Sequence, residues 1–342
     1  MFIALKIDVD TLRGTLEGVP RLATLLSRLD INATFLFSLG PDHTGRALRR
    51  LLRPGFLKKV MRTSVGSNYG LKTLCYGTLL PGPDIGRRGA DAMRAVRDAG
   101  FEVGIHTWDH VRWQDYVARR GAEWTRREMA LAVERFRDVF GDDAKTIGAA
   151  GWQMNSHAFA LEEDFGFDYA SDTRGTQPFI PVVDGRRFRC PQLPTTLPTL
   201  DELVGRDGIM IENVAEHIVA ASCSPRPSGE GPGVRVGTTS TSGEPKVNRG
   251  RVPSPQPLSR GERGFNDCHV FTLHAELEGL AYLEIFERVL REWQARGYDI
   301  GSTRDLFSTL DVAALPAIEV VRAEVPGRSG DLAVQGTRSR LL

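Results

Sequence analysis

The pattern of apolar and polar residues divides most of the chain into alternating strand-like and helix-like segments. Residues 2–9 and 33–39 are apolar runs of strand length, and residues 17–29 between them place apolar side chains at helical spacing. The same reasoning predicts further helices over 91–99, 126–140 and 282–297. It predicts further strands over 102–106, 146–152, 168–172, 269–276 and 298–301. This order predicts a parallel α/β fold, and its regular alternation favours a (β/α) barrel over an open sheet.

Two segments lack this pattern. Residues 224–264 have Pro, Gly or Ser at 21 of 41 positions and no aromatic residue, which predicts a disordered surface insertion without a function. Residues 312–342 include a strand-like run, but the Gly and Arg residues that follow it predict a loosely structured tail. We therefore expect one domain over 1–311, which carries the insertion, and a tail over 312–342.

Composition and charge narrow the class of protein only a little. Of the 342 residues, 41% are hydrophobic, which is typical of a soluble globular protein. The net charge of +1 gives no reason to expect nucleic-acid binding, and the four cysteines form no CxxC pair. No apolar run reaches the roughly 18 residues of a membrane span, and the N-terminus does not resemble a signal peptide. A cytoplasmic protein is expected, unless it is held at a membrane surface.

Polar side chains follow the expected strands at the points where the strands end. Asp8 and Asp10 end the first strand, and His106, Asp172 and His274 end three later ones. In a (β/α) barrel the active site is built at the carboxyl ends of the strands. The sequence therefore predicts a functional site that contains these five residues.

The spacing of the acids and histidines predicts a metal site. Asp8 and Asp10 are two positions apart on a strand and point the same way, and His106 and His110 in HTWDH would share one face of a helical turn. Two histidines and one carboxylate are a common ligand set for zinc, cobalt, manganese or nickel. We expect Asp10, His106 and His110 to be the ligands and Asp8 to be a general base. The alternatives are structural histidines and a solvated or helix-capping acid.

Other residues near these strand ends are candidates for supporting roles. His274 is the natural general acid, since imidazole titrates near neutrality, and a histidine packed at a strand end is the alternative. Asp172 is a candidate to orient His274, and Arg174 is a candidate to pair with Asp8 or to polarise a substrate carbonyl. An ordinary surface ion pair of Asp172 and Arg174 is the alternative. Trp152 and Glu276 are candidate substrate contacts.

Residues 43–83 contain no Asp or Glu and have a basic amphipathic pattern. Apolar residues stand among the candidate lipid-binding residues, which are Arg46, Arg49, Arg50, Arg53, Lys58 and Lys59. Such a pattern is suited to an anionic membrane interface, and here it predicts docking on a membrane surface. The alternative is a helical excursion that packs on the barrel with a solvated basic face.

Three short motifs resemble those of the polysaccharide-deacetylase (NodB-homology) family. IDVDT resembles its first motif, HTWDH its second, and TLHAE the motif that carries the catalytic acid. The resemblance implies a distorted (β/α) barrel with Asp8 as base, Asp10, His106 and His110 as metal ligands and His274 as acid. One motif departs from the family, because AAGWQ has Gln153 where many members carry an arginine that contacts the base.

Further stretches, among them SLGPDHTGRALRR, SDTRGTQPF and QLPTTLPTLDELVGRD, resemble one branch of this family. That branch removes the formyl group from a formamido-arabinose carried on undecaprenyl phosphate, a step in lipid A modification and polymyxin resistance. The resemblance implies this lipid-linked sugar as the substrate, with no protein partner. The alternatives are a deacetylase of an N-acetyl amino sugar and an inactive, metal-containing membrane-binding module.

Overall fold

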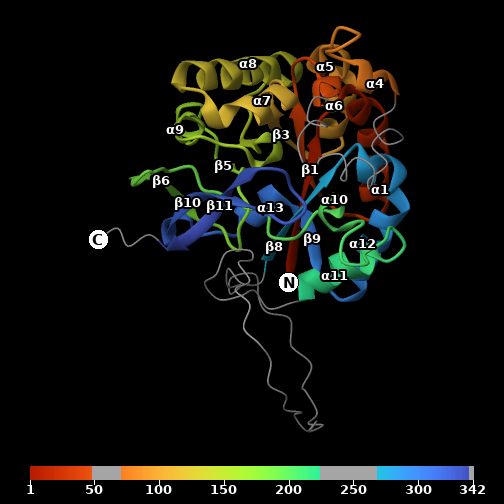
Figure 1. Cartoon of the computed structure of the whole chain (residues 1–342). Coiled ribbons are helices and arrows are strands. Elements are labelled where there is room, and N and C mark those ends of the chain that lie inside the picture. The colour runs from red at the N-terminus through yellow and green to blue at the C-terminus, as the bar shows by residue number, and fades with distance from the viewer. Residues whose placement is uncertain (48–70, 224–267, 339–342) are drawn as a thin grey trace.

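A parallel sheet of seven strands forms the centre of the computed structural model, which describes residues 1–47, 71–223 and 268–338 (Figure 1). The strands lie in the order β5-β4-β3-β2-β1-β8, and β9 also pairs with β1. They are β1 (Phe2–Val9), β2 (Thr34–Ser38), β3 (Glu102–Thr107), β4 (Thr146–Ile147), β5 (Tyr169–Ala170), β8 (Cys268–His274) and β9 (Asp299–Ser302). Among the described residues β5 and β8 do not pair, so the barrel is incomplete. The expected distorted (β/α) barrel is confirmed.

Strand β1 pairs with β2, β8 and β9 within this sheet. Every residue of it except Phe2 is buried, as expected for a parallel strand covered on both faces. In its register with β8, Asp8 lies opposite His274. The carboxyl ends of these two strands therefore meet at one edge of the sheet.

Helices cover the outside of the sheet and carry apolar stripes toward it (Figure 1). In α12 (Leu283–Ala295) the buried residues Phe286, Val289, Leu290 and Trp293 follow the helical spacing of an amphipathic helix. The other helices are α1 (Val19–Arg28), α4 (Leu71–Cys75), α5 (Ile85–Arg88), α6 (Ala90–Asp98), α7 (His110–Tyr116), α8 (Ala122–Phe140), α9 (Ser156–Asp164), α10 (Leu200–Leu203), α11 (Val214–Cys223) and α13 (Thr303–Phe307).

The strand predicted over 146–152 is largely wrong. Only Thr146–Ile147 pairs as β4, and a short helical turn over Ala150–Trp152 follows it. Gly151 and Trp152 both have positive φ angles, of 62° and 54°, which a strand does not allow. This turn ends β4 early and sends Trp152 into the interior.

The expectation of a loosely structured tail is wrong for most of 312–342. Strands β10 (Ala317–Glu324) and β11 (Asp331–Arg338) form a second sheet with β6 (Ile180–Val183) and β7 (Arg186–Arg187), on the side away from α1 and α12 in Figure 1. Buried Leu332 and Val334 pack against Trp152. Gly327 and Gly330, with φ of 91° and 75°, belong to the turn between the strands rather than to a mobile end.

Two predicted segments lie largely outside the described residues. The insertion predicted over 224–264 falls entirely there, as do residues 48–70 of the basic amphipathic segment. Across the described part of the chain, no helix combines the length and the apolar character needed to cross a membrane.

Candidate metal centre and acid–base residues

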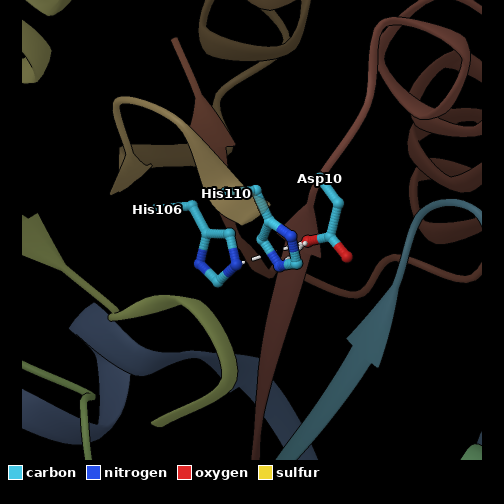
Figure 2. Close-up of side chains that lie close together, drawn as sticks. All are labelled: Asp10, His106 and His110. Atoms are coloured by element: carbon cyan, nitrogen blue, oxygen red, sulfur yellow. Dashed lines mark ion pairs between the residues drawn. The ribbon is translucent and has the colours of Figure 1, made fainter. Parts of the chain in front are cut away.

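Asp10, His106 and His110 converge at the carboxyl edge of the sheet (Figure 2). Asp10 directly follows β1, His106 is the penultimate residue of β3, and His110 is the first residue of α7. The Nε2 atoms of both histidines lie 3.3 Å from Oδ1 of Asp10. The three ligand atoms all lie within 4.8 Å of one another, so one ion can reach all three.

The two histidines meet in a different way from that expected. They do not share a helical turn, because the chain leaves β3 after Thr107 and only then begins α7. Asp109 caps this helix by accepting a hydrogen bond from the backbone N–H of Arg112. The imidazole rings nevertheless stack, with centroids 5.3 Å apart and planes 27° apart. The bend at Asp109 therefore places His110 beside His106.

The donor set fits a divalent cation. The Nδ1–H of His106 donates to the carbonyl oxygen of Gly148 at 2.6 Å, which leaves Nε2 with a free lone pair toward Asp10. Oδ1 of Asp10 is buried and accepts no hydrogen bond from the described residues. Metal bonds of about 2.0–2.2 Å place neighbouring N and O ligands about 3 Å apart, close to the separations found here.

The electrostatics of these residues also favour a cation. Burial alone would raise the pKa of Asp10, but His110 and His106 outweigh it and hold the pKa below its usual range. Burial would lower the pKa of His106, but Asp8 and Asp10 together raise it above the ordinary histidine value. Asp10 is therefore held as the carboxylate, the form that binds a metal ion, and the two acids favour positive charge beside them.

Asp8 and His274 lie beside these three residues on neighbouring strands. Oδ2 of Asp8 lies 3.2 Å from Nζ of Lys6, and Oδ1 lies 3.7 Å from Nδ1 of His106. His274 faces Asp8 across the β1–β8 register, and its Nδ1 has no hydrogen-bond partner among the described residues. The structure therefore brings together the three predicted metal ligands, the predicted base Asp8 and the predicted acid His274.

Glu276 supports the turn that carries Asp10. Its Oε1 accepts hydrogen bonds from the backbone N–H groups of Asp10 and Thr11 and from the hydroxyl of Thr11. Burial and the charge of Asp10 hold the pKa of Glu276 well above its usual range. A Cβ on Gly14 would lie 1.9 Å from this carboxylate, so only glycine fits there. Glu276 is 1% exposed and its Oε1 binds this turn, so in the structure it supports Asp10, and the substrate contact stays a prediction.

Glu278 accepts a hydrogen bond from the backbone N–H of His274 at 2.9 Å and is also fully enclosed. Burial raises the pKa of this carboxyl from 4.5 to about 8, despite that hydrogen bond. Protonated Glu278 is thus favoured in the folded state. Its contribution to stability is complete below pH 4.5 and is lost as the pH rises through about 8.

We expect Glu278→Gln to flatten the decline in the free energy of unfolding between these two pH values. Within that window the free energy of unfolding falls by up to about 1.4 kcal/mol for each pH unit. A neutral amide does not titrate, so the variant lacks this loss. Urea unfolding of the variant and the parent protein at about pH 5 and about pH 9 checks this. An equal decline in both proteins would contradict it.

Asp172 does not orient His274. It accepts hydrogen bonds from the backbone N–H of Ala149 and from the side-chain amide of Gln192. Ala149 adjoins Gly148, whose carbonyl orients His106. Asp172 therefore supports the histidine of a different strand, because β5 lies beyond β4 and far along the sheet from β8.

Arg174 does not pair with Asp8, and it does not form the surface ion pair considered as an alternative. Its guanidinium donates to Glu202 at 2.8 Å and to the carbonyl of Leu197, and the side chain is buried. Trp152 is 1% exposed, donates to the hydroxyl of Thr195 and stacks with Arg174. The predicted substrate contact of Trp152 is therefore wrong, and both residues belong to the interior.

Two contacts at the site were missed by the sequence analysis. The sequence gives no signal that Lys6 and His43 belong to the site. In the structure, Nδ1 of His43 lies 2.6 Å from the carboxylate of Asp109, the residue before His110. Arg46 donates to the carbonyl of Gly77, whereas Arg49, Arg50, Arg53, Lys58 and Lys59 lie outside the described residues.

Comparisons with known proteins agree with this site. The polysaccharide deacetylase family model matches residues 3–170. The chain is 33% identical over 335 residues to the probable 4-deoxy-4-formamido-L-arabinose-phosphoundecaprenol deformylase ArnD of Shewanella sediminis, covering 98% of this chain and 95% of that one. It is 28% identical over 323 residues to the protein of the same name from Wigglesworthia glossinidia brevipalpis, covering 94% and 98%.

Solved structures show the same fold. A protein classed as a polysaccharide deacetylase from Mycobacterium smegmatis superposes with a TM-score of 0.57 at 15% identity, covering 95% of this chain and 94% of that one. A probable polysaccharide deacetylase from Pseudomonas aeruginosa gives 0.51 at 12% identity, with 90% of each chain covered. The chain therefore belongs to the polysaccharide deacetylase family, in the branch of the deformylases that it matches over nearly its whole length.

Proposed function

We propose that this chain removes the formyl group from 4-deoxy-4-formamido-L-arabinose carried on undecaprenyl phosphate. The observation that carries the proposal is the match of 33% over 98% of the chain to a deformylase of that name. The convergence of Asp8, Asp10, His106, His110 and His274 at one sheet edge supports it. The reaction is the hydrolysis of an amide by water, which gives formate and a free amine.

Asp10, His106 and His110 would hold one divalent ion, which polarises the amide carbonyl and makes water a better nucleophile. Zinc, cobalt, manganese and nickel all suit two imidazoles and one carboxylate. His106 is fixed for this purpose by Gly148, and Asp10 by the hydrogen bonds from its turn to Glu276.

Asp8 and His274 divide the proton transfers between them. Asp8 accepts a proton from the attacking water through Oδ1, which has no hydrogen-bond partner among the described residues. His274 gives a proton to the amine nitrogen as the carbon–nitrogen bond breaks, since an unprotonated amine anion is a poor leaving group. Their positions opposite each other on β1 and β8 allow both to reach one amide.

The basic amphipathic segment, residues 43–83, is proposed to bring this edge of the protein to the lipid. Its first residues are tied to the site, because His43 contacts Asp109, the cap of the helix that begins with His110. Its last part presents Leu79, 84% exposed, and Leu80, 43% exposed. With the basic residues of 43–83, these side chains suit the anionic cytoplasmic face of the inner membrane.

Liposome flotation tests this docking. Each basic residue near an anionic surface contributes about 1 kcal/mol, so the protein is expected to float with anionic vesicles at low salt and to be released at high salt. Leu79→Ser should weaken flotation, whereas Val321→Ser, an equally small change at an exposed position on β10, should not. Protein that stays in the soluble fraction at low salt would contradict the proposal.

Which acyl group the chain removes is tested by comparing two substrates that differ only in that group. We expect purified, metal-loaded protein to hydrolyse formamido-arabinosyl polyprenyl phosphate in preference to the matched acetamido compound, as judged by kcat/KM. Preference for the acetyl group would instead make the chain a deacetylase, a possibility that its family model leaves open. Activity on neither compound would favour a binding protein.

A further inference from the structure

Lys6 is a buried cation in the interior of strand β1. It lies between apolar Leu5 and Ile7 in β1 and is 0% exposed. Burying an ammonium group away from water is costly unless an opposite charge is close by. The position of Lys6 therefore requires a partner.

The partner is the Asp8 carboxylate. Nζ of Lys6 lies 3.2 Å from Oδ2 of Asp8, and this is the one ion pair of Lys6 in the described part of the chain. Residues two apart on a strand project to the same face, so the pairing follows from the backbone of β1 itself. Both members of the pair are therefore carried by one buried strand.

The surroundings of the ammonium group are shaped for it. The ring centroid of Trp152 lies 5.3 Å from Nζ, within the range of a cation–π contact. A Cβ on Gly148 would lie 2.8 Å from Cε and 3.2 Å from Nζ of Lys6, so a larger residue would displace the side chain. The same Gly148 orients His106 through its carbonyl oxygen.

The other cations near Trp152 are already paired elsewhere. Arg174 and Arg328 both stack with the Trp152 ring. Their Cζ atoms lie 5.0 and 4.6 Å from the ring centroid, respectively. Arg174 pairs with Glu202, and Arg328 pairs with Glu202 and Asp201. Of the three cations at this tryptophan, Lys6 is the one that pairs with Asp8.

We propose that Lys6 is the positioning residue for Asp8, an inference that rests on the proposed deformylase function. The charge of the ammonium group attracts Oδ2, which favours the orientation in which Oδ1 lies on the side of His106 and can accept the proton of water. Lys6 thus supplies from β1 the cationic contact to Asp8 that Gln153 does not make, since the Gln153 amide donates to the carbonyl of Asp331.

The test is a double-mutant cycle with Lys6→Met and Asp8→Asn. Removing a group that orients a catalytic or metal-binding side chain typically costs about 10–100-fold, so we expect a loss of that size in kcat for Lys6→Met, with KM and metal content near those of the parent protein. If Lys6 acts through Asp8, the double variant should be no slower than Asp8→Asn alone. Lys6→Arg, which keeps the charge, should recover part of the lost kcat.

Two results would overturn the inference. One is full kcat in Lys6→Met, and the other is a double variant in which the two losses multiply. Lys145→Met, the same change at an exposed position before β4, is the matched control and should leave kcat unchanged.

Urea unfolding of the parent protein, the two single variants of the cycle and the double variant gives a readout that does not need substrate. The Lys6→Met and Asp8→Asn effects on the free energy of unfolding should be strongly non-additive, because each single variant leaves one buried charge unpaired. If the parent protein did not deformylate the lipid-linked sugar, the proposed function would fail while this cycle still reported on the pair. Additive effects would contradict the pairing whatever the substrate.

Discussion

Replacing Asp8 with asparagine is expected to lower kcat by about 10²–10⁴-fold while the protein keeps its metal. The amide has nearly the shape of the carboxylate, but it cannot take a proton from water. Asp8 lies beside the proposed ligand set without belonging to it, so metal content should be unchanged. Turnover of the formamido sugar and metal analysis of the same purified sample check the two halves of this expectation.

The stability of the variant provides the control. Asparagine leaves Lys6 without its anionic partner, so some loss in the free energy of unfolding is expected together with the loss of activity. Activity should therefore be measured well below the midpoint of thermal unfolding. Full activity in Asp8→Asn would remove Asp8 from the role of base.

Replacing His110 with alanine is expected to remove both the metal and the activity. The variant leaves His106 and Asp10 as the only members of the ligand set, and two ligands hold a divalent ion far more weakly than three. His110 is the first residue of α7 and keeps some exposure, so the fold should survive the change. The loss of kcat should be at least as large as that of Asp8→Asn.

A matched control is available in His157, an exposed histidine in α9. His157→Ala should keep its metal content and kcat, which shows that the effect belongs to the site and not to the loss of any histidine. Metal analysis after gel filtration measures both variants. Retention of one metal ion per chain in His110→Ala would contradict the proposed ligand set.

Much of the site could be foreseen because it depends on local sequence and on a general property of parallel sheets. Apolar runs identify β1, β3 and β8 whatever their partners, and the carboxyl ends of parallel strands meet at one edge. Asp10, His106 and His274 follow from their places at those ends. The predicted geometry of His106 and His110 was wrong. They do not share a helical turn, and a bend capped by Asp109 brings His110 to His106.

The supporting residues could not be foreseen because their partners are distant in sequence. Arg174 meets Glu202, and Glu276 meets the backbone of Asp10, 266 residues away. Lys6 gave no signal, because the sequence does not show whether a single lysine within an apolar strand is paired with an acid. The structure of the tail was predicted wrongly for a related reason. Its strands pack on Trp152, which is distant in sequence, and a local sequence pattern does not show such packing.

The measurement that tests the account most directly is mass spectrometry of formamido-arabinosyl undecaprenyl phosphate after incubation with the purified, metal-loaded protein. We predict complete loss of the formyl group, with release of formate, by the parent protein and almost none by Asp8→Asn or by protein stripped of metal. An unchanged lipid in the presence of metal-loaded parent protein, or equal conversion by all three samples, would contradict the proposed function.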